Sequence, residues 1–252
     1  DRSRMGNETS FGLGFSGNEM IGKFVAGNDF NYVQAHATSI AASGKYNISS
    51  CSSEVIASGR VQMKNYQAVD LINGLERHDG YTHAFFKSFT PALQNRIRQY
   101  ASQGGRILIS GSYTGSDMQT EEEQAFLSDI LKLSYEPTGS TAITRDINPE
   151  DSTVTERESI VYTSPNVTGL GLQFSYYNEL NAQHYAATHP EILKPVGNYA
   201  FTAMQYDTGT SAAVAYKSTT YRSFVMGFPL ECIIDESTRT SVLLGILKFL
   251  TD

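Results

Sequence analysis

The stretch Arg106-Ile107-Leu108-Ile109-Ser110-Gly111-Ser112-Tyr113-Thr114-Gly115-Ser116-Asp117 decides the fold of this chain. Ile107–Ser110 predicts a short buried strand, the glycines after it predict a sharp turn, and Glu121-Glu122-Glu123 begins a helix. Open α/β sheets place their sites where a strand enters such a turn. α/β enzymes mount a nucleophile there in the pattern Gly-x-Ser/Cys-x-Gly. Here the middle position holds Tyr113, so the clearest functional indication is negative.

Strands alternate with helices on both sides of this turn. Pro91 after Thr90 is typical of a helix start, and apolar spacing of three and four residues indicates the other helices. Four strand–helix alternations predict right-handed crossovers. We therefore expect a flavodoxin-like three-layer α/β sandwich with a mostly parallel central sheet. The expected strands are Lys23–Ala26, Ala68–Glu76 and Ile107–Ser110, with a second, edge-like strand within 46–58, and the expected helices are Tyr32–Ala42, the segment after Thr90, Glu121–Leu133 and Ser237–Leu250.

The whole chain, residues 1–252, is expected to form a single domain. Residues 1–20 are glycine-rich and indicate an irregular lead-in. From 135 to 215 helical periodicity disappears and short alternating segments predict a β-rich elaboration on one edge of the sheet. Ala212–Tyr216 and Arg222–Phe228 are separated by a short connection, which predicts a hairpin.

The composition limits the partners. A net charge of −7 argues against a nucleic-acid surface, which needs clustered Lys and Arg. No run approaches the ~18 apolar residues of a membrane helix. The opening Asp1-Arg2-Ser3-Arg4 has no apolar segment behind it, which indicates a mature chain or an excised domain. Few lysines and many Ser, Thr, Tyr and Asn suit an exported bacterial protein, so we expect a secreted, periplasmic or cell-surface location. Cys51 and Cys232 fit either a disulfide or two separate buried thiols.

Four segments carry a resemblance to a known group of proteins. They are Gly27-Asn28-Asp29-Phe30-Asn31-Tyr32, Val69-Asp70-Leu71-Ile72-Asn73-Gly74-Leu75-Glu76, Ile109-Ser110-Gly111-Ser112-Tyr113 and Gly227-Phe228-Pro229-Leu230-Glu231. Over most of residues 20–252 the chain resembles secreted Bacteroides-type proteins that bear the name xanthan lyase and have a golvesin-like domain elsewhere. The resemblance implies a class I glutamine amidotransferase-like fold. It does not imply lyase chemistry, since lyases of that activity are built on helical toroids and β-sandwiches.

Amidotransferase chemistry is not expected. That family needs a Cys at the turn, activated by a His that a carboxylate orients. The pattern places Tyr113 at the nucleophile, and a phenol with a pKa of ~10 is a poor acyl-transfer nucleophile. Ser112 lies one position early. His189-Pro190-Glu191 mimics the His-Pro-Glu of the family but lies in the irregular region, so we interpret it as a chance match.

Polar side chains follow each expected core strand, and parallel strands bring their carboxyl ends to one edge of the sheet. We expect a small polar ligand site there. Structural alternatives remain open for several members: Asp29 and Asp117 as helix caps, Glu231 as a partner of a loop backbone or Arg222, and His36 as a packed helix residue. The expected ligand-binding residues are Asn28, Asp29, Glu76, Ser112, Tyr113, Asp117 and Glu231.

Two functions are compatible with these residues. The favoured one is a non-catalytic module of a larger secreted protein that binds carbohydrate, a protein partner or other domains of the same polypeptide. The alternative is a hydrolase or lyase acting on polysaccharide or cell-wall material through Glu76 and Asp117, which would need to lie ~5–10 Å apart. No His-x-x-x-His or Asp-x-Asp spacing indicates a metal, and no cofactor is expected.

Overall fold

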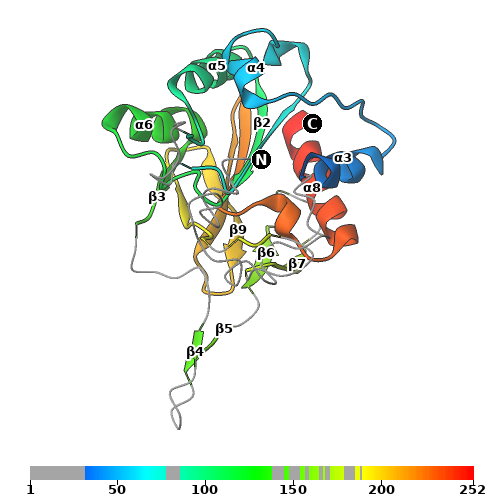
Figure 1. Ribbon diagram of the computed structural model, residues 1–252, viewed down its shortest axis with the longest axis vertical. Helices are drawn as coiled ribbons and strands as arrows, with labels where there is room; N and C mark the ends of the chain where they lie inside the picture. Colours follow the sequence, from blue (N-terminus) through cyan, green and yellow to red (C-terminus); the bar gives the residue numbers. More distant parts are fainter. Residues whose placement is uncertain are drawn as a thin grey trace, which may run out of the picture.

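The computed structural model describes residues 32–77, 86–137, 145–147, 154–156, 159–164, 167, 171–178, 185–187 and 189–252, with backbone alone at 145–147, 154–156 and 159. Seven strands form one sheet in the order β1-β2-β11-β10-β9-β6-β7, curled into a half-barrel (Figure 1). The strands are β1 (Val69–Gly74), β2 (Arg106–Gly111), β6 (Ser159–Thr163), β7 (Gln173–Tyr176), β9 (Ala200–Tyr206), β10 (Ser211–Lys217) and β11 (Arg222–Met226).

The expected mostly parallel, flavodoxin-like sandwich is wrong. Within the main sheet, β2 pairs in parallel with β1 and with β11. β11, β10, β9, β6 and β7 are joined by antiparallel pairings. Short connections link β9 to β10 and β10 to β11, which antiparallel neighbours allow and parallel ones do not. The segment 135–215 is therefore not an edge elaboration alone, since it supplies strands of the main sheet.

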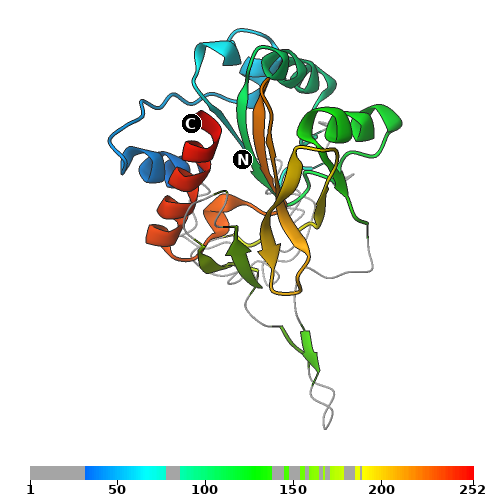
Figure 2. The same cartoon turned by 180° about the vertical axis from the view of Figure 1, so that it is seen from behind.

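Helices cover both faces of the sheet. One core layer packs α3 (Tyr32–Ala41) and α8 (Glu236–Thr251) against β2 and β11 through side chains such as Leu108 and Phe224. The other packs α4 (Ser53–Ala57), α5 (Pro91–Ser102) and α6 (Glu121–Phe126) against the same strands through Ile107 and Ile109. Even and odd positions of β2 thus face opposite layers, as the pleat of a strand requires. Figure 2 shows the same two layers from behind.

The remaining elements are short. A π-helical turn, η2 (Leu127–Leu131), continues α6, and the 3₁₀ turns η1 (Met63–Asn65) and η3 (Leu230–Cys232) lie in connections. Two small antiparallel pairs complete the described part: β3 (Leu133–Tyr135) with β8 (Leu193–Pro195), and β4 (Arg145–Ile147) with β5 (Val154–Glu156). None of the described helices is long and apolar enough to cross a membrane.

The local predictions around the turn are confirmed. Thr90 caps α5 by accepting the N–H of Leu93, with Pro91 at the first position. The β10–β11 hairpin forms as expected, and α8 covers the predicted C-terminal segment. The expected strand Lys23–Ala26 lies outside the described residues. Cys51 is exposed, Cys232 is buried, and both are free thiols.

Candidate active-site elbow

The turn after β2, which we call the elbow (residues 111–117), depends on close backbone packing. The N–H of Ser112 donates to the carbonyl of Gly74 at 2.7 Å. A Cβ on Gly111 would lie 2.8 Å from the Cβ of Asn73, and a Cβ on Gly115 would lie 2.5 Å from that of Tyr135. The two glycines therefore let the end of β2 approach β1 and β3 closely.

Tyr113 occupies the nucleophile position of the elbow and is 4% exposed. Its hydroxyl shares a 2.8 Å hydrogen bond with Nδ1 of His189. The guanidinium carbon of Arg77 lies 4.3 Å from the centre of the phenol ring, a cation–π contact. Burial and the nearby Arg77 charge hold the pKa of His189 below its usual value, so the imidazole is neutral at pH 7.

Glu191 is bound to the elbow through both carboxylate oxygens. Oε2 accepts the N–H of Gly115 at 2.6 Å and Oε1 accepts the N–H of Ser116 at 2.9 Å. Burial raises the pKa of Glu191 to about 7, although these N–H donors act in the opposite direction. Its backbone N–H also donates to the carbonyl of Gly227 at 2.7 Å, which fixes the segment to the end of β11.

The interpretation of His189-Pro190-Glu191 as a chance match is therefore wrong. Both titratable side chains of this motif reach the elbow from 75 or 76 residues away in the sequence. The motif itself was visible in the sequence. Its position was not, because no regular periodicity connects it to the core strands.

Asp117 joins the elbow to the loop before α5. Its Oδ2 accepts the N–H of Ser88 at 2.8 Å, and burial raises the pKa of the carboxyl. The Ser88 hydroxyl is within 2.9 Å of the carbonyl of Glu76 and 3.2 Å of that of Tyr113. The alternative that Asp117 caps a helix is wrong: Thr120 caps α6, in a capping box with Glu123.

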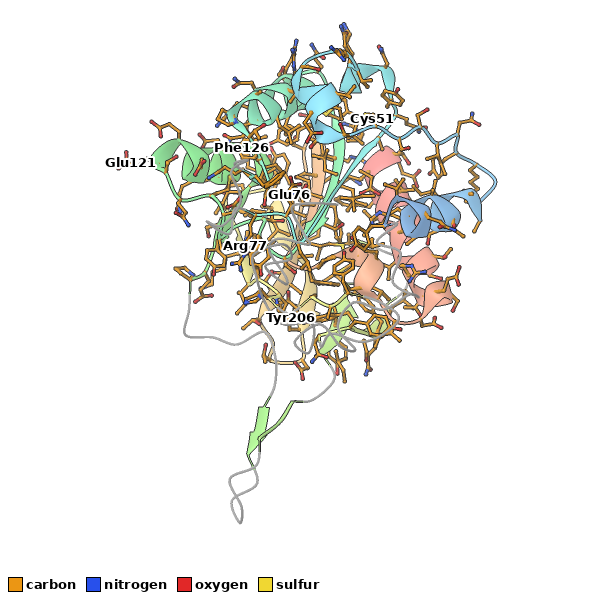
Figure 3. All side chains as sticks on the ribbon, viewed as in Figure 1. Cys51, Glu76, Arg77, Glu121, Phe126 and Tyr206 are labelled. Atoms are coloured by element: carbon orange, nitrogen blue, oxygen red, sulfur yellow. The ribbon has the colours of Figure 1, made fainter. Side chains whose placement is uncertain are left out.

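Glu76 and Arg77 follow Leu75 just after β1 ends at Gly74, and Figure 3 labels both. Ser112 is fully buried, and its hydroxyl makes no hydrogen bond to any described residue. Ser112 is thus not the residue that meets His189. Among the expected site residues, Tyr113, Asp117 and the backbone of Glu76 are brought together by Ser88 and the elbow, whereas Asn28 and Asp29 lie outside the described residues.

Glu231 belongs to a separate buried cluster and not to the elbow site. Its Oε2 lies 3.1 Å from Nε2 of His36, and its Oε1 accepts the hydroxyl of Tyr185. Nδ1 of His36 lies 2.6 Å from Asp70. Burial lowers the pKa of His36, but the two carboxylates outweigh it and raise the pKa to about 10. The expected pairing of Glu231 with Arg222 is wrong, because Arg222 donates to the carbonyl of Phe249.

The predicted packing role of His36 is confirmed, since it is 2% exposed and bridges α3 to β1 and η3. Within the part of the chain that the structure describes, no group of three His, Cys, Asp or Glu side chains is arranged to hold a metal ion.

No family model and no curated protein sequence matches this chain. Solved structures share its fold. The β-galactosidase of Rahnella sp. R3 aligns with a TM-score of 0.51 at 14% identity, over 91% of this chain and 28% of that one. The β-galactosidase of Bacillus circulans sp. alkalophilus gives 0.51 and 12%, over 88% and 27%. The mmIFT52 N-terminal domain gives 0.57 and 13%, over 91% and 96%.

At these identities the likeness shows a shared fold and nothing of activity. The chain spans only 28% and 27% of the two β-galactosidase chains that it matches. The resemblance to the xanthan lyase group, and the secreted location expected with it, stay predictions that none of these neighbours tests.

Proposed function

We propose that this chain is a non-catalytic carbohydrate-binding module of a larger protein, with its binding surface at the elbow. The observation that carries the proposal is the pairing of Tyr113 with His189. A phenol stands where an acyl-transfer enzyme needs a thiol or hydroxyl, and its hydroxyl is already hydrogen-bonded to the one imidazole that reaches it among the described residues.

The carboxylate supports the same conclusion. In a nucleophile–His–carboxylate triad the carboxylate orients the imidazole. Here both oxygens of Glu191 accept backbone N–H groups of the elbow instead. Glu191 therefore stabilises the turn through both of its oxygens, which differs from the orienting role that the carboxylate has in such a triad.

The chemistry of the exposed part of the site suits hydroxyl groups. Nδ1 of His189 pairs with the Tyr113 hydroxyl, so Nε2 is the atom that would meet a sugar hydroxyl, which can both donate and accept. His189 is exposed, and Arg77 beside it adds N–H donors. Tyr113 is buried beneath them and acts as a positioning residue. The fold shared with parts of two β-galactosidases agrees with a carbohydrate ligand.

A glycan array followed by calorimetry tests the proposal, with galactose-containing oligosaccharides as the first probes. We expect saturable binding that His189→Ala weakens at least about 10-fold, or ~1.4 kcal/mol. Lys217→Gln on the opposite end of the sheet is a control that should leave binding unchanged.

A parallel turnover screen addresses the hydrolase alternative. We expect no cleavage of any oligosaccharide. Cleavage that is lost in Glu76→Gln or Asp117→Asn would contradict the proposal and make the two carboxyls acid and base. Capture of a protein partner at the elbow with no glycan bound would contradict the choice of ligand.

A further inference from the structure

A cleft lies at the other end of the sheet from the elbow. It opens between the α4–η1 segment and α5, with a volume of about 160 Å³. The η1 turn precedes β1, and the lining residue Gln103 precedes β2, so the cleft borders the amino ends of these strands. Figure 1 shows α4 and α5 side by side above the sheet. Ile56, Met63 and Tyr100 are its buried apolar residues.

Arg96 is held in place at this cleft. Its Nε donates to the carbonyl of Ala57 at the end of α4. The guanidinium lies directly against Gly59, and a Cβ at this position would make the end of the Arg96 side chain move. Gly59 also has a φ of +79°, a conformation that other residues rarely adopt. The turn after α4 therefore favours glycine for its backbone conformation, and the missing side chain lets the Arg96 guanidinium pack against it.

The cleft carries an uncompensated positive charge. Lys64 and Arg96 both line it, and none of its lining residues is acidic. Among the described residues neither cation forms an ion pair. The carbonyls at the end of α5 could also hold a cation, but those of Tyr100 and Ala101 already accept N–H groups from residues 103–105. The local charge of the cleft is therefore positive, although the chain has a net charge of −7.

We propose that this cleft binds a small organic anion, with a carboxylate or phosphate group on Arg96 and Lys64 and a short apolar body over Met63 and Tyr100. An Arg fork suits the two oxygens of such a group. The glutamine side chains at the rim, such as Gln99, add amide donors. The site is independent of the elbow, so its failure would not affect the proposed carbohydrate binding.

An NMR titration of the full chain tests the proposal, with butyrate and inorganic phosphate as separate probes. We expect saturable shifts of the Gly59, Lys64 and Gln99 amides with a dissociation constant of about 1 mM. Tighter binding of butyrate would indicate that the apolar residues of the cleft contribute to affinity. Tighter binding of phosphate would indicate that the anionic group alone determines it. Added NaCl should weaken binding by either anion.

Variants distinguish a specific anion site from nonspecific electrostatic attraction of anions to the protein surface. Arg96→Gln and Lys64→Gln should each reduce affinity at least about 5-fold, which corresponds to ~1 kcal/mol. Lys64 is exposed, so its variant is expected to fold normally. Lys45→Gln, an exposed lysine beyond α3, is the charge-matched control. The proposal is overturned if neither anion gives saturable shifts, or if both cleft variants bind as the Lys45 variant does.

Discussion

Stability should fall as the pH rises from about 6.5 to about 10, because of His36. Its folded-state pKa is raised from 6.5 to about 10 by Asp70 and Glu231. A cation with a raised pKa contributes stability that is complete below its unfolded-state pKa and is lost as the pH passes through the folded-state pKa. The shift corresponds to ~5 kcal/mol, or ~1.4 kcal/mol per pH unit across this window.

Urea unfolding monitored by circular dichroism at half-unit pH steps measures this slope. Lysines and tyrosines also titrate near pH 10, so the difference between the wild type and His36→Gln is the relevant quantity. The variant should lose roughly 3–5 kcal/mol below pH 6.5, because it leaves two carboxylates without their cation. The decrease in its free energy of unfolding with pH should also be smaller, by the ~1.4 kcal/mol per pH unit that His36 contributes.

His189→Gln is the matched control. The pKa of His189 is lowered, so this residue stays neutral throughout the window and its replacement should leave the slope intact. Identical slopes in the wild type and His36→Gln would refute the assignment of a charged, buried imidazole.

Three further predictions concern the elbow and its supports. The pKa of Glu191 is raised from 4.5 to about 7, so its contribution to the free energy of unfolding is complete below pH 4.5 and is lost as the pH rises through about 7. In urea unfolding at a series of pH values, Glu191→Gln should remove ~3 kcal/mol of the decrease in stability across this window. An unchanged decrease would contradict the raised pKa. Gly111→Ala should destabilise by about 1–3 kcal/mol in the same assay because its Cβ meets that of Asn73, and an unchanged free energy of unfolding would contradict the close approach of β2 to β1. Thr120→Ala should lower the thermal midpoint through a loss of ~1 kcal/mol at the start of α6, and a change within error would mean that the capping box is not formed.

The sequence was sufficient for the local structure around the elbow. Apolar runs, caps and glycines are short-range signals, and they located β2, α5 and the β10–β11 hairpin correctly. The order and direction of the strands in the sheet could not be predicted from such short-range signals. The hairpin predicted the antiparallel β10–β11 pair, but periodicity alone could not show that β9, β6 and β7 extend the same sheet beyond it.

The candidate site was partly predictable for the same reason. Tyr113 and Asp117 lie within a few residues of β2, and both were identified. His189 and Glu191 reach the elbow only through the tertiary fold. Glu231 was expected at the elbow because it follows a late strand, but η3 places it beside His36 of α3. A position just after a strand predicts the edge of the sheet at which a side chain lies, but it does not predict which other residues that side chain contacts.

Whether the elbow binds a sugar without cleaving it can be decided by a time-resolved NMR titration of the labelled chain with a galactose-terminated oligosaccharide. We expect saturable shifts of the His189 imidazole and of the Gly115 and Ser116 amides, while the oligosaccharide remains intact for days. Release of a shorter sugar, or binding with no shift at these three residues, would contradict a non-catalytic carbohydrate site at the elbow.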